Sequence, residues 1–238
     1  MTATTRFLIT CEHGGNRIPQ RYRPLFRGFE SMLHSHRGYD RGAISMAKEL
    51  ASALDAPMFA GTTSRLLVDL NRYVGHPHLY SEVIWCASAA VRREILERHF
   101  LPYRNKVESA IADAIHHGSR VIHISSHSFT PVLDGQVRTA DIGLLYDPSR
   151  PSERELCGRW QASLKTLAPG LVVRRNYPYT GNSAGFTAHL RRKFPDSNYV
   201  GIELEINQKH VIKGGPQWRA LRSSVIEALH EALPVMPI

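Results

Sequence analysis

The sequence predicts an α/β protein, with a mostly parallel central sheet between two layers of helices (three-layer α/β/α). Short apolar runs alternate along the chain with longer segments in which apolar residues recur at helical spacing. Such alternation is typical of parallel sheets, because a helix carries the chain back to the start of the next strand. No linker divides the 238 residues, so we expect residues 1–238 to form a single domain.

The first half of the chain contains two long helical segments and several short strands. Residues 42–56 carry apolar residues at helical spacing, and Asp40 stands where an N-cap is expected. Residues 89–117 predict one long helix or two consecutive helices that join at Pro102, since proline interrupts helical hydrogen bonding. The strands expected in this half cover residues 7–10, 58–60 and 66–68.

The second half repeats the alternation. Residues 176–185 (NYPYTGNSAG) are rich in turn formers and predict a loop, which a short helix follows as far as Phe194. The strands expected here cover residues 121–125, 142–146, 171–173 and 199–206. The helices cover residues 152–167 and 217–233.

Composition favours a folded, water-soluble protein of a reducing compartment. The chain is 42% hydrophobic and 21% charged, which argues against disorder. Its three cysteines are odd in number and lack paired spacing, so we expect no disulfide framework. No apolar run approaches the ~18–20 residues of a membrane span, and the first residues lack the apolar core of a signal peptide. We therefore expect a cytoplasmic protein that does not bind membranes.

The formal net charge is +9, which allows an anionic ligand or a nucleic acid. The basic residues are scattered in short clusters, and no run of six or more occurs. No aromatic RNA-binding motif or zinc-finger spacing accompanies them. The charge pattern thus favours a small acidic molecule over nucleic acid, although a basic protein without catalytic activity remains an alternative.

Two histidines follow apolar strands at widely separated places in the sequence. His13 lies in CEHGGN (residues 11–16), and His127 lies in HISSHS (residues 123–128). The carboxyl ends of parallel strands meet at one edge of a sheet, where α/β proteins build their sites. A metal site with His13 and His127 as ligands is one interpretation, and two hydrogen-bonded structural histidines are the other.

A zinc site needs a third protein ligand, and Asp40 is our candidate. It lies in the loop before the helix that follows the first strand, which brings it to the same edge as His13. Glu12 is the competitor, but in an extended segment it points away from the side on which His13 lies. The ligand set that we expect is therefore His13, Asp40 and His127, with Zn2+ as the ion.

Glu203 and Glu205 lie on one face of the otherwise apolar strand 199–206. Two carboxylates on a core strand are unfavourable unless cations or a metal ion lie nearby. An edge strand with one solvated face is the simpler interpretation. The functional interpretation makes one of them a general base, with Glu205 preferred because it is nearer the end of the strand.

The segment SRLLVDLNR (residues 64–72) offers groups that can hold a carboxylate. Arg72 presents a bidentate fork and Asn71 an amide donor. Arg65 and Arg175 are further candidates for this role. Tyr179 lies in the loop 176–185, which we interpret as a lid that contributes specificity, although an ordinary surface turn has the same composition.

These motifs together resemble the N-formylglutamate amidohydrolase family, which is similar in plan to zinc carboxypeptidases and aspartoacylase-like deacylases. The stretches that carry the resemblance are CEHGGNRIP (11–19), YDRGA (39–43), SRLLVDLNR (64–72), SSHSF (125–129) and IELEINQ (202–208). Zinc carboxypeptidases have a His and an acid, then Asp-x-Asn-Arg, then His-Ser at a strand end, then a late Glu. Here His13, Asp40, Asn71 with Arg72, His127 with Ser128, and Glu205 follow that order. The acid departs from the carboxypeptidase spacing of three, because Asn16 stands there.

The resemblance implies a phosphorylase/hydrolase-like fold and hydrolysis of an N-formyl or other N-acyl amino acid, as in histidine degradation. It implies that Glu205 acts as the base, that zinc activates water, and that a small anionic acyl-amino acid is the substrate. A zinc deacylase or carboxypeptidase-like amidase of another substrate is the enzymatic alternative. A basic protein that binds anions or nucleic acid is the alternative without catalysis. The acyl group, the amino-acid side chain and the oligomeric state do not follow from the sequence.

Overall fold

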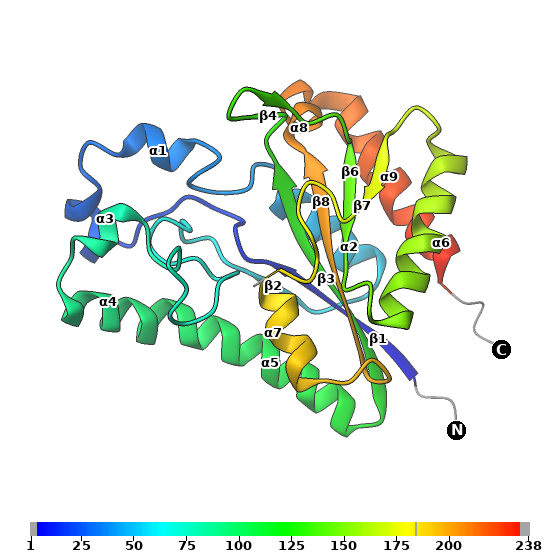
Figure 1. Cartoon of the computed structure of the whole chain (residues 1–238), viewed down its shortest axis with the longest axis horizontal. Helices are drawn as coiled ribbons and strands as arrows, with labels where there is room; N and C mark the ends of the chain where they lie inside the picture. The colour runs from blue at the N-terminus through cyan, green and yellow to red at the C-terminus, as the bar shows by residue number, and fades with distance from the viewer. Residues whose placement is uncertain (1–3, 184, 234–238) are drawn as a thin grey trace.

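A computed structural model describes residues 4–183 and 185–233. It contains a central sheet with helices on both faces, together with a region of loops and short helices on one side (Figure 1). The predicted three-layer α/β/α class is confirmed.

The central sheet has six strands in the order β2-β1-β3-β8-β6-β7. Every neighbouring pair is parallel except β6 and β8, which are antiparallel. The long strands β3 and β8 lie in the middle and are almost wholly buried. The bounds are β1 Thr4–Cys11, β2 Met58–Ala60, β3 Ser119–Phe129, β6 Ile142–Leu145, β7 Val173–Arg175 and β8 Tyr199–Asn207.

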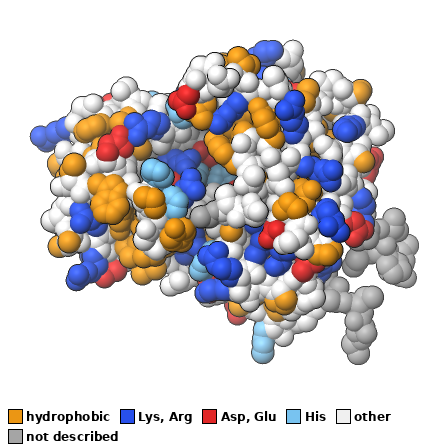
Figure 2. All heavy atoms as spheres, viewed as in Figure 1, with side chains coloured by type: hydrophobic (Ala, Val, Ile, Leu, Met, Phe, Trp, Pro, Cys, Tyr) orange, Lys and Arg blue, Asp and Glu red, His pale blue; other side chains and the backbone are white. Residues whose placement is uncertain are grey.

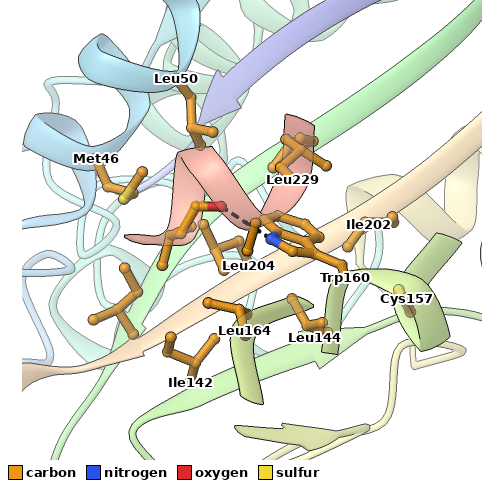
Figure 3. Packing of buried hydrophobic residues seen from close by; sticks show 14 of the residues in the cluster. Met46, Leu50, Ile142, Leu144, Cys157, Trp160, Leu164, Ile202, Leu204 and Leu229 are labelled. Carbon is orange, nitrogen blue, oxygen red and sulfur yellow. Dashed lines mark hydrogen bonds between the residues drawn. The ribbon is translucent and has the colours of Figure 1, made fainter. Parts of the chain in front are cut away.

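Helices cover both faces of the sheet because each presents one apolar stripe to it. One layer consists of α2 (Ala43–Ala53), α6 (Pro151–Leu167) and α9 (Gly215–Ala232), and the other of α5 (Leu101–His116) and α7 (Phe186–Lys193). Figure 3 shows the core beneath the first layer, where the buried indole of Trp160 donates a hydrogen bond to the carbonyl of Val225 at 3.0 Å. Burial of these side chains fixes the sheet whose edge carries the site.

A second region, residues 17–40 and 61–100, lies beside the sheet, and we call it the flank (Figure 1). It has a hydrophobic core of its own, which includes Leu67, Ile84 and Phe100. Its helical segments are short: η1 Gln20–Phe26, α1 Glu30–His34, α3 Glu82–Trp85, α4 Ala89–Ile95 and the π-helical η2 Leu96–Phe100. Two smaller elements follow β3 and β8, namely the hairpin β4 (Val132–Leu133) with β5 (Gln136–Val137), and α8 (Gln208–Lys213).

Three local expectations need correction. Residues 66–68 form no strand; their buried side chains pack into the core of the flank, which a buried loop can do as well as a strand. Asp40 does not cap α2 with its side chain, because Gly42 is the N-cap residue and has a φ of 84°. The strand expected at 171–173 is β7, which begins and ends two residues later.

The helical segment 89–117 is one continuous rod of three parts, α4, η2 and α5. The π-helical turn η2 directly precedes α5, in which Pro102 occupies the first turn. Proline donates no backbone hydrogen bond, so the regular pattern shifts just before it. Among the described residues, no helix has both the length and the apolar composition needed to cross a membrane.

Candidate active site

Three potential metal ligands meet at the carboxyl ends of β1 and β3. Asp40 Oδ2 lies 2.8 Å from Nδ1 of His127 and 3.4 Å from Nδ1 of His13. One ligand atom from each of these residues can be chosen so that all lie within 4.8 Å of one another. All three residues are buried. Two imidazole nitrogens and one carboxylate oxygen form a typical donor set for zinc.

The backbone brings these residues together from distant parts of the sequence. His13 follows β1, and His127 lies near the end of the neighbouring strand β3. Asp40 belongs to the flank, and its backbone N–H donates a hydrogen bond to the carbonyl of His13 at 2.9 Å. The positive φ of Gly42 then turns the chain into α2, and a Cβ there would lie 2.5 Å from Val211.

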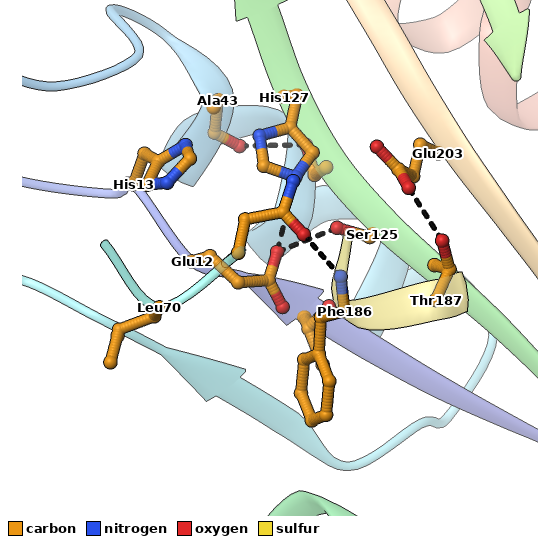
Figure 4. Close-up of polar contacts among 12 residues, drawn as sticks. Glu12, His13, Ala43, Leu70, Ser125, His127, Phe186, Thr187 and Glu203 are labelled. Carbon is orange, nitrogen blue, oxygen red and sulfur yellow. Dashed lines mark hydrogen bonds and ion pairs between the residues drawn. The ribbon is translucent and has the colours of Figure 1, made fainter. Parts of the chain in front are cut away.

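Each histidine uses its second ring nitrogen to contact another buried carboxylate. His13 Nε2 lies 2.7 Å from Oδ1 of Asp69. His127 Nε2 forms an ion pair with Oε2 of Glu12 at 3.2 Å, and Ser125 donates to the same oxygen at 2.6 Å (Figure 4). Carboxylates in this position orient metal-binding histidines so that the other ring nitrogen faces the ion.

The acidic groups of the site are held in their charged form. Burial alone would raise the pKa of Glu12 and Asp40, but contacts with His127, and for Asp40 also His13, hold both well below their usual values. Asp69 behaves likewise, since Arg65 and His13 lower its pKa against the effect of burial. Burial would lower the pKa of His127, but its contacts with the carboxylates of Asp40 and Glu12 raise it well above its usual value. This concentration of carboxylates around two imidazoles suits a bound cation.

Glu203 and Glu205 face the same cavity from the central strand β8, so the edge-strand interpretation is wrong. Glu205 pairs in register with His127 of β3. Its Oε2 atom is buried and has no hydrogen-bond partner in the described parts of the chain. Burial, with the nearby charges of Asp40 and Glu203, raises the pKa of Glu205 to about 8, although His127 acts in the opposite direction. Glu203 instead accepts a hydrogen bond from Thr187 at 2.5 Å (Figure 4).

The flank contributes the donors that face these carboxylates. Arg65 is held by Asp69 at 2.7 Å and lies 3.4 Å from Asp40. The Nε atom of Arg72 is buried, lies 3.9 Å from Asp69 and makes no hydrogen bond to a described residue. Asn71 accepts a hydrogen bond from the backbone N–H of Phe186 at 2.6 Å, which fixes the side chain at the start of α7.

All these groups line one cavity of 470 Å³, which we call the catalytic cavity. The hollow on the face shown in Figure 2 contains acidic, basic and histidine side chains. Of the residues named from the sequence, those that line the cavity are His13, Asp40, Arg65, Asn71, Arg72, His127, Ser128, Tyr179, Glu203 and Glu205. Arg175 does not line it; the residue is exposed on β7, where its guanidinium lies on the side of Gly158 in α6.

The family model of N-formylglutamate amidohydrolase matches residues 5–212. The chain belongs to this family. The match includes every residue that lines the catalytic cavity, and family membership supports hydrolysis of an amide bond as the activity.

Several solved structures are similar to the chain, and two of them follow. The gene product Atu2144 from Agrobacterium tumefaciens has 27% sequence identity and a TM-score of 0.82, over 97% of this chain and 91% of that one. N-formylglutamate amidohydrolase from Ralstonia eutropha JMP134 has 16% identity and a TM-score of 0.71, over 97% and 93%. The second likeness shows that the fold is shared. No curated protein matches the sequence.

Sequence reasoning missed the carboxylates behind the histidines. Glu12 was considered only as a ligand, and Asp69 only as part of the segment before Asn71 and Arg72. One signal in the sequence could have indicated this role for Glu12. It is a charged residue between an apolar strand and His13, where a buried carboxylate needs a partner. Only the packing of β1 against β3 brings Glu12 to His127 and Ser125.

Proposed function

We propose that this protein is a zinc-dependent amidohydrolase that cleaves the N-formyl, or another N-acyl, amide of an amino acid such as N-formylglutamate. One observation carries the proposal. A potential metal-ligand set, an unpartnered buried glutamate and an unpartnered arginine nitrogen all face one cavity in a member of an amidohydrolase family.

The metal would be held by His13, Asp40 and His127, with Asp69 and Glu12 orienting the two imidazoles. A bound zinc ion supplies Lewis acidity and lowers the pKa of water toward ~7. The donor set supports zinc over magnesium or calcium, because those ions prefer oxygen ligands.

Glu205 acts as the general base and acid. Its Oε2 atom takes a proton from the attacking water and later returns the proton to the leaving nitrogen. The missing hydrogen-bond partner of this oxygen supports the role, since nothing in the described chain competes for the proton. Glu203 is fixed by Thr187, and its charge raises the pKa of Glu205, which makes Glu205 a stronger base toward water.

Arg72 and Asn71 hold the α-carboxylate of the substrate through charge-assisted and amide hydrogen bonds. Arg65 keeps Asp69 and Asp40 in position, and the same ion pairs limit how far it can turn toward a substrate. Ser128 and Tyr179 complete the walls around the substrate. The substrate is thus a small anionic acyl-amino acid.

The test is metal analysis of the purified protein followed by assays with a panel of N-acyl amino acids. We expect about one zinc ion per chain, loss of activity after chelation and recovery after zinc is restored. Release of formate from N-formylglutamate is the direct readout. A protein that binds no metal, or that hydrolyses no acylated amino acid when loaded with zinc, would contradict the proposal.

A further inference from the structure

A second cavity of 450 Å³ adjoins the catalytic cavity and shares Arg65 and Arg72 with it. We call it the outer cavity. Its walls come from the flank, and Figure 2 shows hydrophobic and histidine side chains beside the central hollow on this face. Apart from Arg65, Asp69 and Arg72, the residues that line this cavity have no role in the mechanism described above.

Most charged groups around the outer cavity are already paired with one another. Arg37 donates hydrogen bonds of 2.6 and 2.9 Å to the two carboxylate oxygens of Glu82. Arg65 donates hydrogen bonds of 2.7 and 3.2 Å to Asp69. The Nε atom of Arg72 lies 3.9 Å from Asp69 and makes no hydrogen bond within the described residues, and Arg72 lies at the boundary with the catalytic cavity. The outer cavity therefore offers little unpaired charge to an acidic side chain.

The rest of the wall combines aromatic and apolar side chains with a few uncharged polar ones: Leu66, Pro77, Tyr80 and Trp85 beside His36, His78 and Ser81. Trp85 is 48% exposed, which is unusual for the largest apolar side chain. Its indole N–H donates to the carbonyl of Pro77 at 3.1 Å, and the Tyr80 hydroxyl donates to that of Arg92 at 2.8 Å. The two rings meet edge to face with centroids 5.7 Å apart. Since their polar atoms are satisfied within the protein, these side chains offer ring surface to a ligand.

Arg72 sets the direction of a bound substrate. A carboxylate held by this guanidinium lies between the two cavities, because Arg72 lines both. The acylated nitrogen on the α-carbon must reach Glu205 in the catalytic cavity. The side chain on the same carbon then has the outer cavity open to it, whereas the catalytic cavity is lined mostly by polar and charged side chains.

We propose that the outer cavity binds the side chain of the substrate's amino acid and selects an aromatic side chain. The inference rests on the proposed function and narrows its substrate class to N-acyl derivatives of aromatic amino acids.

The experiment compares kcat/KM for N-formylphenylalanine, N-formylglutamate and N-formylalanine in the zinc-loaded protein. We expect the phenylalanine substrate to exceed both others by about tenfold or more, since burial of an apolar side chain in a fitted pocket supports discrimination of this size. The variant Trp85→Ala should lower kcat/KM for N-formylphenylalanine about tenfold and change it for N-formylalanine less than about twofold.

The control is Tyr73→Ala, which removes a similarly exposed aromatic ring (41%) from the flank without altering a residue that lines either cavity. We expect the three substrates to keep their wild-type ranking in this variant. An equal loss on all substrates in Trp85→Ala, or a wild-type preference for N-formylglutamate, would overturn the inference while leaving the proposed function intact.

If no substrate is hydrolysed, ligand binding still tests whether the outer cavity selects the side chain. Calorimetry with N-formylphenylalanine and N-formylalanine measures the side-chain preference in the wild type and in Trp85→Ala. A preference of about tenfold that disappears in the variant supports the outer cavity as a side-chain site, although the proposed function has failed. Equal affinity for the two ligands overturns the inference as well.

Discussion

The sheet and the flank contribute different parts of the site. The strands β1, β3 and β8 provide His13, His127, Glu203 and Glu205, each at or near the carboxyl end of a strand that is packed from both faces. The flank provides Asp40, Arg65, Asn71 and Arg72 from loops above a smaller core. The two proposed metal-binding imidazoles and the proposed base thus lie on or directly after strands of the central sheet, and most of the groups proposed to bind the substrate lie on loops of the flank.

Asp40 joins the two regions. Its carboxylate contacts both histidines of the sheet, while Arg65 of the flank approaches its other oxygen. A metal ion held by these residues would tie the flank to the sheet. Substitutions in the sheet should therefore affect metal binding and the chemical step, whereas substitutions in the flank, apart from Asp40 and Asp69, should affect substrate selection.

The largest effect is expected for His127→Ala. Loss of one of three protein ligands leaves His13 and Asp40, which cannot hold a four-coordinate ion tightly. Zinc content after dialysis should fall to background and activity with it. His34→Ala, which removes an exposed histidine of α1, should retain zinc. Full zinc occupancy in the His127 variant would refute the ligand assignment.

Glu205→Gln should separate the chemical step from metal binding. The amide keeps the size of the side chain but cannot take the proton, so turnover should fall by roughly 10²–10⁴-fold while zinc is retained. Stopped assays with parallel zinc analysis measure both quantities. Undiminished activity would move the role of base to Glu203, for which Glu203→Gln is the matched test. Loss of zinc would instead make Glu205 a ligand.

Glu12→Gln tests the carboxylate behind His127. Removal of its charge leaves the imidazole less firmly oriented, and zinc affinity should fall by about 10–100-fold. Competition with a chelator measures the affinity, and thermal unfolding shows whether the variant is folded. Ser125→Ala, which removes only one hydrogen bond to Glu12, should cause a smaller loss. Unchanged affinity in a folded Glu12→Gln protein would contradict this positioning role.

Arg72→Lys tests the flank. Lysine keeps the positive charge but loses the bidentate fork, so kcat/KM should fall by about tenfold for a substrate with a free α-carboxylate. The loss should be much smaller for the corresponding amide, which has no anion to hold. Comparison of acid and amide in both proteins isolates the interaction as in a double-mutant cycle. An equal loss of kcat/KM on the acid and the amide would mean that Arg72 has a structural role or interacts with the carbonyl group under attack, not with the α-carboxylate.

The smallest effect on activity is expected at His123, which lies deeper in the sheet. Burial lowers the pKa of His123 to about 4, and its ring nitrogens lie 2.7 Å from the hydroxyl oxygens of Thr10 and Tyr199. The unfolded chain binds a proton near pH 6.5 while the folded one does not, so stability is lost as pH falls below 6.5. Protonation of His123 in the unfolded chain should lower the free energy of unfolding of the wild type by about 2 kcal/mol between pH 7 and pH 5. In His123→Gln this contribution should be absent, so the free energy of unfolding should fall by about 2 kcal/mol less over the same range. Denaturant titrations at both pH values measure the free energy of unfolding of the two proteins. An equal pH dependence in the wild type and in His123→Gln would contradict a lowered pKa of His123.

Local sequence patterns predicted much of the sheet region. Strand β8 was expected over residues 199–206 and extends over Tyr199–Asn207, because its alternation of Ile and Leu with Glu is a strong period-two signal. Helix α6 was expected from residue 152 and begins at Pro151. The flank was predicted poorly. Its apolar residues 66–68 resemble a strand in sequence, yet they pack as a loop, and most of its short helices have too few turns to show periodicity.

The sequence by itself determined the fold class and the residue types of the site, because hydrophobic periodicity and strand-end polar residues are local features. Tertiary structure decided which of those residues meet. Asp40, 27 positions after His13, reaches both histidines only because the flank folds back over the sheet edge. Glu12 contacts His127 across neighbouring strands, and Arg72 lies between two cavities that distant loops enclose. Such contacts depend on how separate cores pack against each other, and no short stretch of sequence encodes that packing.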